Sequence, residues 1–225
     1  MEGAAAHHLG RVLRAQPGQL YELSDGTQVY LARVESVTRD RIDFALEEEI
    51  PSYQPAVTMT LLMSIVKFDA FEWALEKATE LGAATIVPVA AARSERALLA
   101  ASEKRAERWG KILAEASQQS RRVRVPDLAS VTRPGPAFSG YPEATKIMLS
   151  ERIGAPTLRE VLAGEQRASA GQAVLAIGPE GGWTEEEFEL ALAAGFREAS
   201  LGKLILRTET AVIAALASLN FAVGA

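Results

Sequence analysis

Two stretches near the C-terminal end of the chain combine glycine, proline and threonine in the manner of ligand-binding loops. The first, residues 175–195, begins as an apolar strand, turns through Gly178-Pro179-Glu180-Gly181-Gly182 and continues as an amphipathic helix. Glycines allow a backbone to approach a ligand closely. The turn has neither the Lys-Ser/Thr pair of a triphosphate site nor the Gly-x-Gly-x-x-Gly spacing of a dinucleotide site. On spacing alone, a tight strand-to-helix turn explains these glycines as well as a ligand does.

The second stretch, LGKLILRTETA at residues 201–211, also runs from strand to loop to helix. Thr208 or Thr210 can cap the helix, and Glu209 suits its positive end. Capping does not explain why Arg207 comes just before them. It also does not explain the small residues of the helix, which favour a close-packed interface or a crowded core.

A third stretch, AEASQQSRRVRVP at residues 114–126, ends a predicted helix with three arginines in four residues. Arginine is favourable at a helix C-terminus, but three exceed what capping requires. If the segment is extended, Arg122 and Arg124 point to the same face.

Composition limits the chemistry that the chain can perform. The 225 residues include no cysteine, which excludes disulfides and thiolate chemistry, and the only histidines are His7 and His8. A metal site is therefore not expected. The net charge of −5 argues weakly against a general nucleic-acid binder, although local arginine clusters can bind RNA through one face. The sequence has no secretory signal and no apolar run long enough for a membrane span, which predicts a cytoplasmic protein.

The N-terminal part is expected to be a small β-domain over residues 1–52. Short strands are predicted at 19–23, 28–37 and 41–46, with a hairpin turn at 24–27. Residues 1–16 fit either a helix or a strand. Three glutamates and two prolines within 47–58 indicate a linker.

From residue 57 to 225, apolar strands alternate with helices. Asp69 is expected to cap a helix with Glu72 three residues on, and Thr184 and Glu187 form a capping box. Strands are predicted at 57–64, 85–90, 145–150, 173–177 and 198–201, helices at 102–117, 157–163, 184–194 and 209–222, and a loop at 132–143. This alternation predicts an α/β domain with a mostly parallel sheet covered on both faces. Ligands in such sheets bind beyond the carboxyl ends of the strands.

These motifs together resemble a known family. IGPEGG is followed about 20 residues later by LGKLILRTETA, with HHLGRVLRAQPGQLYELSDG, ELGAATIVPVAAARSER and EASQQSRRVRVP upstream. In this order they resemble the SPOUT-class ribosomal RNA small-subunit methyltransferase E family, which methylates N3 of a uridine in 16S rRNA. The chain departs from the family pattern in two places. It has Gln118-Gln119 where Glu-Gln is common, and it lacks an initial basic strand, which implies an incomplete or differently closed barrel.

The resemblance implies a PUA-like β-barrel followed by an α/β domain with a C-terminal trefoil knot. It also implies that the two loops clasp S-adenosylmethionine without a metal. The cofactor-binding residues would be Leu149, Ile177, Gly178, Pro179, Glu180, Gly181, Gly182, Leu201, Gly202, Leu204, Leu206, Arg207, Thr208, Thr210 and Ala211.

Methylation at uridine N3 requires loss of a proton and stabilisation of the resulting anion. Arg122 and Arg207 are the candidate cations. Glu180 and Glu209 are the candidate proton acceptors, with water as the alternative. Contacts with 16S rRNA in the small ribosomal subunit are expected from seven basic residues: Arg11, Arg14, Lys67, Arg93, Arg121, Arg122 and Arg124.

Three other functions are compatible with parts of the pattern. A non-catalytic RNA-binding assembly factor would retain the fold, but the intact GPEGG and LRTETA stretches favour an enzyme. A SPOUT enzyme acting on tRNA is distinguished only by its substrate. A nucleotide-binding oxidoreductase is disfavoured because Gly-x-Gly-x-x-Gly is missing.

The final helix predicts a homodimer. It is apolar on nearly all sides, through Val212, Ile213, Leu216, Leu219 and Phe221. Such a helix must be covered all round, and a sheet covers one side only. A second chain would cover the rest, and the alternative is a wholly intramolecular contact. The dimer is thus expected to depend on Leu216 and Leu219.

Overall fold

The structure is a computed structural model that describes residues 1–51, 55–163 and 171–223. Its contacts divide the chain into two units, Met1–Gln54 with Arg122–Arg124 and Pro55–Arg121 with Val125–Ala225. Residues 52–54, within the predicted linker and at the expected domain boundary, lie outside the described residues.

The first unit contains a three-stranded antiparallel sheet in the order β1-β2-β3. Its strands are β1 (Leu20–Ser24), β2 (Val29–Val37) and β3 (Ile42–Ile50). Asp25 fixes the expected hairpin turn, because its Oδ1 accepts the backbone N–H groups of Thr27 and Gln28, each at 2.8 Å.

The sequence of residues 1–16 fits either a helix or a strand, and the structure shows helix over most of this segment. An α-helix, α1 (Gly3–His7), continues into a π-helical turn, η1 (His8–Val12). Ala6, Leu9 and Ala15 are buried there with Val34 and Ile42 of the sheet, forming a small separate core.

Strand β3 is four residues longer than expected. The expected strand end at residue 46 was wrong, since Glu47–Glu49 continue the strand and pair with β2 through Leu31↔Glu48 and Tyr30↔Glu49. The three glutamates are exposed, and the first forms a salt bridge with Arg33 at 2.6 Å. Charged side chains on an exposed strand end are compatible with pairing, which a composition-based linker assignment overlooks.

The second unit contains a six-stranded sheet in the order β6-β5-β4-β8-β7-β9. Its strand pairs are all parallel, as the alternating pattern predicted. The strands are β4 (Thr58–Ser64), β5 (Ala83–Val89), β6 (Asp127–Leu128), β7 (Thr145–Leu149), β8 (Gln172–Ile177) and β9 (Arg197–Ala199).

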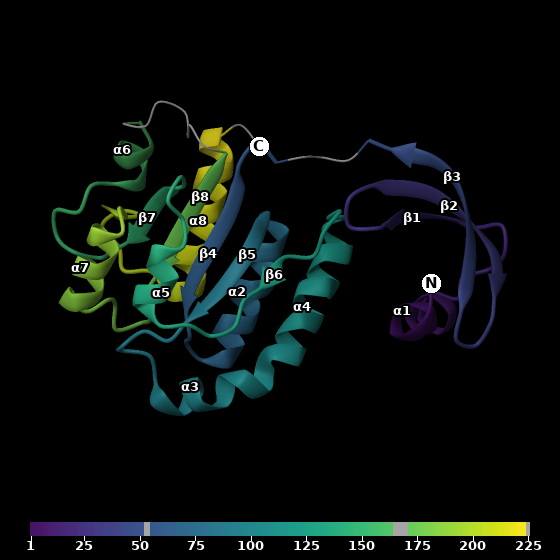
Figure 1. The fold of residues 1–225 in the computed structure, drawn as a ribbon, viewed down its shortest axis with the longest axis horizontal. Helices are drawn as coiled ribbons and strands as arrows, with labels where there is room; N and C mark the ends of the chain where they lie inside the picture. The colour runs from purple at the N-terminus through teal and green to yellow at the C-terminus, as the bar shows by residue number, and fades with distance from the viewer. Residues whose placement is uncertain (52–54, 164–170, 224–225) are drawn as a thin grey trace. The chain divides into compact units, whose positions relative to one another are not determined.

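Helices cover both faces of this sheet (Figure 1). Successive residues of β4 enter different cores, with Leu61 and Met63 on one face and Leu62 on the other. The first face packs against α2 (Phe68–Glu80), α4 (Ala106–Gln119), α6 (Leu158–Ala163) and α8 (Thr208–Val223). The second packs against α5 (Pro134–Ser139) and α7 (Glu185–Ala193). The remaining helices are α3 (Arg96–Ser102) and the 3-10 turn η2 (Glu103–Arg105).

The structure confirms some of the expected helix boundaries and corrects others. Thr184 and Glu187 form the predicted capping box. Asp69 is not a cap, because α2 begins at Phe68 after Lys67, and its carboxylate lies in the first helical turn. The helix predicted at 102–117 is instead divided among α3, η2 and α4.

Residues 132–143 were predicted to form a loop but contain helix α5. Proline suits the first turn of a helix, and Pro134 occupies that position in α5. Phe138 is fully buried and lies edge-on to Trp183, with ring centroids 5.7 Å apart. Aromatic burial therefore orders a segment whose proline and glycine content suggested a loop.

Neither a helix able to span a membrane nor a group of potential metal ligands occurs among the described residues. Among the described residues, no helix is long and apolar enough to cross a bilayer. Across the same residues, no three histidine, aspartate or glutamate side chains lie together as potential metal ligands.

Candidate active site

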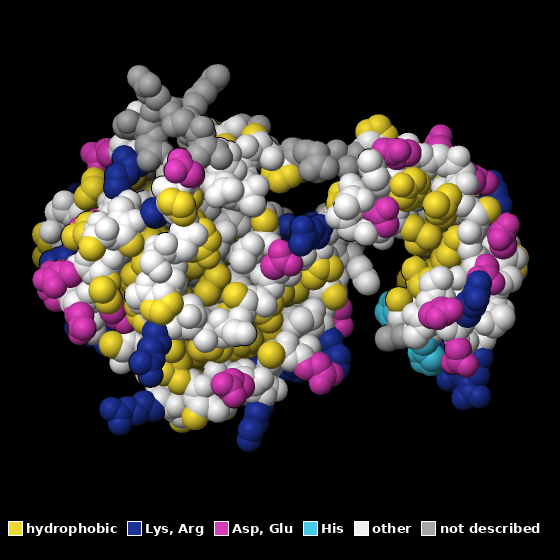
Figure 2. Space-filling model, in the orientation of Figure 1, with side chains coloured by type: hydrophobic (Ala, Val, Ile, Leu, Met, Phe, Trp, Pro, Cys, Tyr) yellow, Lys and Arg dark blue, Asp and Glu magenta, His cyan; other side chains and the backbone are white. Residues whose placement is uncertain are grey.

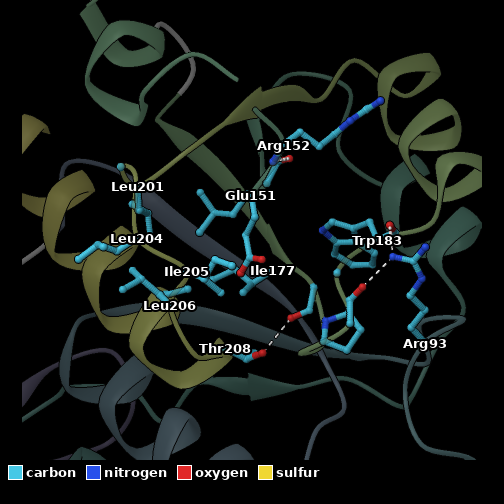
Figure 3. A pocket seen from close by; sticks show the side chains of 18 of the residues that line it. Arg93, Glu151, Arg152, Ile177, Trp183, Leu201, Leu204, Ile205, Leu206 and Thr208 are labelled. Carbon is cyan, nitrogen blue, oxygen red and sulfur yellow. Dashed lines mark hydrogen bonds between the residues drawn. The ribbon is translucent and has the colours of Figure 1, made fainter. Parts of the chain in front are cut away.

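A cavity of about 320 Å³ lies at the carboxyl ends of β7, β8 and β9. Its walls come from the segments that follow these three strands, as expected for a parallel sheet. Leu149 and Ile177 form apolar walls, and both are more than nine-tenths buried. Figure 3 shows Leu201, Leu204 and Leu206 on one side of the cavity and Trp183 and Arg93 on the other.

Most residues predicted to bind the cofactor line this cavity. They are Leu149, Ile177, Gly178, Pro179, Gly181, Gly182, Leu201, Gly202, Leu204, Leu206, Thr208 and Ala211. Glu180, Arg207 and Thr210 are exposed and are not among the lining residues. The volume falls within the range of small-ligand pockets, about 300–1,000 Å³.

The loop at residues 178–182, called the GPEGG loop below, is fastened by side chains from elsewhere in the unit. Arg93 donates from Nη1 to the carbonyl oxygen of Gly181 at 2.7 Å and to that of Trp183 at 3.2 Å. From the other side, the Thr208 hydroxyl donates to the carbonyl oxygen of Gly178 at 3.0 Å. The two motifs that are separated in the sequence are thus hydrogen-bonded to each other.

A buried carboxylate anchors the helix that follows the GPEGG loop. Glu187 accepts the backbone N–H of Ala92 at 2.8 Å and both the N–H and the hydroxyl of Thr184, at 2.7 and 3.0 Å. Ala92 directly precedes Arg93. The segment after β5 therefore holds the helix through Ala92 and the GPEGG loop through the adjacent Arg93.

Two glycines of the loop lie so close to neighbouring side chains that a larger residue would have to displace them. A Cβ atom at Gly178 would lie 3.1 Å from Nε1 of Trp183, and one at Gly181 would lie 3.3 Å from Cβ and Cδ of Arg93. Packing of a tight strand-to-helix turn therefore explains the glycines at these two positions in part. Gly202 differs, since its φ of +128° suits glycine and no atom lies within 4 Å of the Cβ position.

Sequence reasoning missed two charged residues at this cavity, Glu151 and Arg152. In Figure 3 the Glu151 side chain extends into the space between the two loops. Arg152 is turned away, pairing with Glu185 at 2.9 Å and lying over the ring of Phe188. Their position directly after β7, at the same sheet edge as the GPEGG loop, is the signal that would have identified them.

The four proposed catalytic residues do not share one cavity. Arg207 is exposed and Glu209 is half-buried in the first turn of α8. Arg122 belongs by its contacts to the first unit, where the Ser24 hydroxyl donates to the neighbouring Val123 carbonyl at 2.5 Å. Burial lowers the pKa of the Arg122 guanidinium from its usual value.

Glu180 lines a second cavity of about 420 Å³ in the same unit. This cavity, called the lysine cavity below, also includes Lys67 and shares Arg93 and Gly181 with the first. Two basic residues predicted to contact RNA thus lie beside a predicted proton acceptor.

The other predicted RNA-binding residues are exposed arginines. Arg11 lies in the helical start of the chain and Arg14 just after it, while Arg121 and Arg124 follow α4. Arg14 and Arg121 both have positive φ, at 53° and 54°. In Figure 2, lysine and arginine are interspersed with aspartate and glutamate on the visible face of each unit rather than gathered in one basic stripe.

The parallel sheet and the loop-lined cavity agree with the family models that match this sequence. A model described as an RNA methyltransferase domain matches residues 53–220, and one described as an RNA methyltransferase PUA domain matches residues 2–47. The fold and site therefore define an RNA methyltransferase.

Curated relatives narrow this class. Ribosomal RNA small subunit methyltransferase E from Synechocystis sp. is 36% identical over 96% of this chain and 71% of the relative. The Bacillus subtilis protein of that name is 30% identical over 97% of this chain and 88% of the relative. The chain belongs to the ribosomal RNA small subunit methyltransferase E family.

Solved structures agree in fold over almost the full length. The Neisseria gonorrhoeae ribosomal RNA small subunit methyltransferase E bound to S-adenosylmethionine aligns with a TM-score of 0.88 at 33% identity, covering 98% of this chain and 90% of that one. A Legionella pneumophila methyltransferase in complex with the same cofactor aligns with a TM-score of 0.85 at 28% identity, covering 97% and 89%.

Proposed function

We propose that this protein transfers a methyl group from S-adenosylmethionine to N3 of a uridine in 16S rRNA of the small ribosomal subunit. The observation that carries the proposal is the cavity enclosed by the GPEGG loop and the segment at residues 201–211. It occurs in a chain of this family that aligns over nearly its full length with a relative bound to S-adenosylmethionine. A ribosomal substrate also implies action in the cytoplasm.

The residues of the cavity fit such a cofactor. The apolar walls formed by Leu149, Ile177 and Leu206 suit an adenine ring, and the GPEGG and 201–206 segments offer backbone groups beside it. Glu151 supplies a carboxylate, an acceptor for hydroxyl or ammonium groups. The residues assigned to the cofactor are therefore the twelve predicted residues that line the cavity, together with Glu151.

The bound cofactor supplies an electrophilic methyl group attached to a positively charged sulfur. The protein contributes orientation, which lowers the entropic part of the barrier to an in-line displacement. Arg93 and Thr208 hold the GPEGG loop in one conformation through three hydrogen bonds to its carbonyl groups and that of Trp183. This fixation keeps the cavity in shape before the ligand arrives.

The proposal is tested by two measurements on the same protein. Isothermal calorimetry should detect binding of S-adenosylmethionine in the presence of a chelator. Tritiated cofactor with unmethylated small ribosomal subunits should yield one labelled uridine, located by mass spectrometry of nuclease fragments. Cofactor binding without methyl transfer would support a non-catalytic assembly factor instead. Labelling of tRNA would identify the protein as a tRNA methyltransferase.

The finer features of the fold also belong to this proposal. We infer a trefoil knot in the second unit and a PUA-like barrel in the first. The knot is supported by the position of the segment between β9 and α8, which lies against the GPEGG loop through the bond from Thr208 to Gly178. The barrel is supported by the antiparallel β1-β2-β3 sheet.

A homodimer completes the proposal, with a corrected interface. Leu216 and Leu219, on which the dimer was expected to depend, are core residues, 0% and 3% exposed, so they offer no surface to a partner. The rest of α8 provides the support, since Phe221 is 90% exposed. Leu204 and Ile205 at the cofactor cavity are 82% and 80% exposed. Such apolar exposure is typical of a surface covered by a partner.

A further inference from the structure

We propose that the lysine cavity takes the uracil ring of the target nucleotide, with Lys67 as the cation that stabilises the deprotonated ring. The inference rests on the proposed function and assigns its second substrate to a place in the fold. It also assigns Lys67 to the uracil base, whereas the sequence predicted only that this lysine contacts the RNA.

The cavity lies where a parallel sheet most often binds ligands. Ile65, Val66 and Lys67 directly follow β4, and Glu95 and Leu98 follow β5. In the sheet order, β4 pairs with β5 on one side and with β8 on the other. This is the point at which the chain connections diverge, and crevices at such switch points bind ligands.

The lysine cavity also adjoins the cofactor cavity. Gly181 and Arg93 line both cavities, and Glu180 lies between Pro179 and Gly181 of the cofactor cavity. A methyl donor in one cavity and an acceptor ring in the other would thus lie on adjacent sides of the same loop.

The lining of the lysine cavity matches the chemistry of a uracil anion. Ile65 and Val66 provide buried apolar contact for a flat ring. Arg93 is already bonded to two carbonyl groups. Lys67 is exposed, and among the described residues neither its ammonium nor the carboxylate of Glu180 has a hydrogen-bond or ion-pair partner. Two unpaired groups of opposite charge therefore line one cavity.

These groups account for every proton and electron pair of the transfer. The carboxylate of Glu180 accepts the proton from N3, and the ammonium of Lys67 stabilises the negative charge on the adjacent ring carbonyl oxygens. The N3 electron pair then forms the bond to the methyl carbon. The bond from that carbon to sulfur breaks with its pair left on sulfur, giving a neutral thioether, and Glu180 releases its proton to water.

The test compares Lys67→Met with the control Lys104→Met, which alters an exposed lysine outside both cavities. Each protein is assayed for calorimetric affinity for S-adenosylmethionine, for kcat and KM with unmethylated small subunits, and for kcat as a function of pH. Melting curves confirm that each variant is folded. Glu180→Gln is measured in the same series.

We expect Lys67→Met to keep its cofactor affinity within twofold and to lose about 10²- to 10³-fold in kcat, the effect of removing one group that stabilises a developing anion. Its rise in kcat with pH should move to higher pH, because the uracil proton is harder to remove without the cation. Glu180→Gln should lower kcat without weakening cofactor binding.

Two results would overturn the inference while wild-type activity stands. One is a Lys67→Met kcat within twofold of wild type, and the other is a parallel loss of cofactor affinity and kcat. A wild-type protein that binds no cofactor and methylates no RNA would refute the proposed function itself, and the inference with it.

Discussion

Replacing Glu187 with alanine tests how strongly the segment after β5 supports the cofactor loop. The carboxylate is 4% exposed and accepts three hydrogen bonds, one from Ala92 and two from Thr184. Glu187→Ala leaves two backbone N–H groups in partly buried hydrogen bonds, those of Ala92 and Thr184, without their acceptor, while Thr184 still caps the helix. Each lost acceptor costs ~1–2 kcal/mol, so the total is roughly 2–4 kcal/mol.

The consequence should be visible in thermal unfolding of the variant. In a protein of this size, 1 kcal/mol moves Tm by ~2–4 °C, so Glu187→Ala should lower Tm by about 5–15 °C. Calorimetry should also find weaker cofactor binding, because Arg93 follows the released Ala92 and holds Gly181. Glu186→Ala is the matched control, since this neighbour is exposed in the same helical turn. Equal melting temperatures for the two variants would refute the reasoning.

Three further predictions concern cofactor, RNA and assembly. Gly181→Val should weaken S-adenosylmethionine binding at least ~10-fold by calorimetry, because its side chain displaces Arg93 and a lost charged hydrogen bond costs ~1.5–3 kcal/mol. The control is Gly140→Ala, where no atom lies within 4 Å of the Cβ position. Equal cofactor affinities for the two variants would show that the GPEGG loop is not part of the cofactor site. Arg11→Ala with Arg14→Ala should weaken rRNA binding in filter assays and reduce its salt dependence, whereas unchanged binding would show that the first unit is no RNA platform. Phe221→Asp should convert a dimer to a monomer in light scattering at micromolar concentration, and a wild-type monomer that methylates RNA would contradict the dimer.

The parts of the fold that sequence predicted are those fixed by local patterns. The capping box of Thr184 and Glu187 depends on residues three apart, and the apolar strands depend on burial of both sheet faces. Helix α5 was missed because Phe138 is ordered by Trp183 and Phe196, which are far away in the chain. Composition alone does not reveal such contacts.

The candidate site also contains residues that local sequence patterns predicted and residues that only tertiary contacts bring there. Glycine-rich loops are recognisable in sequence, so most of the cofactor cavity was predicted. Glu151 was missed because a charged residue after a strand is common, and only its place beside β8 gives it significance. Arg122 lies in the first unit because of tertiary contacts that its arginine-rich surroundings do not encode.

The wall shared by the two cavities has a thermodynamic consequence. Arg93 and Gly181 line both, so a ligand that shifts either residue in one cavity changes the free energy of binding in the other. Such coupling is reciprocal: the factor by which cofactor changes the affinity for RNA must equal the factor by which RNA changes the affinity for cofactor. If the lysine cavity binds the uracil ring as proposed, a product that has lost its positive sulfur would contact the shared wall differently. The two forms of the cofactor would then give different affinities for the ribosomal substrate.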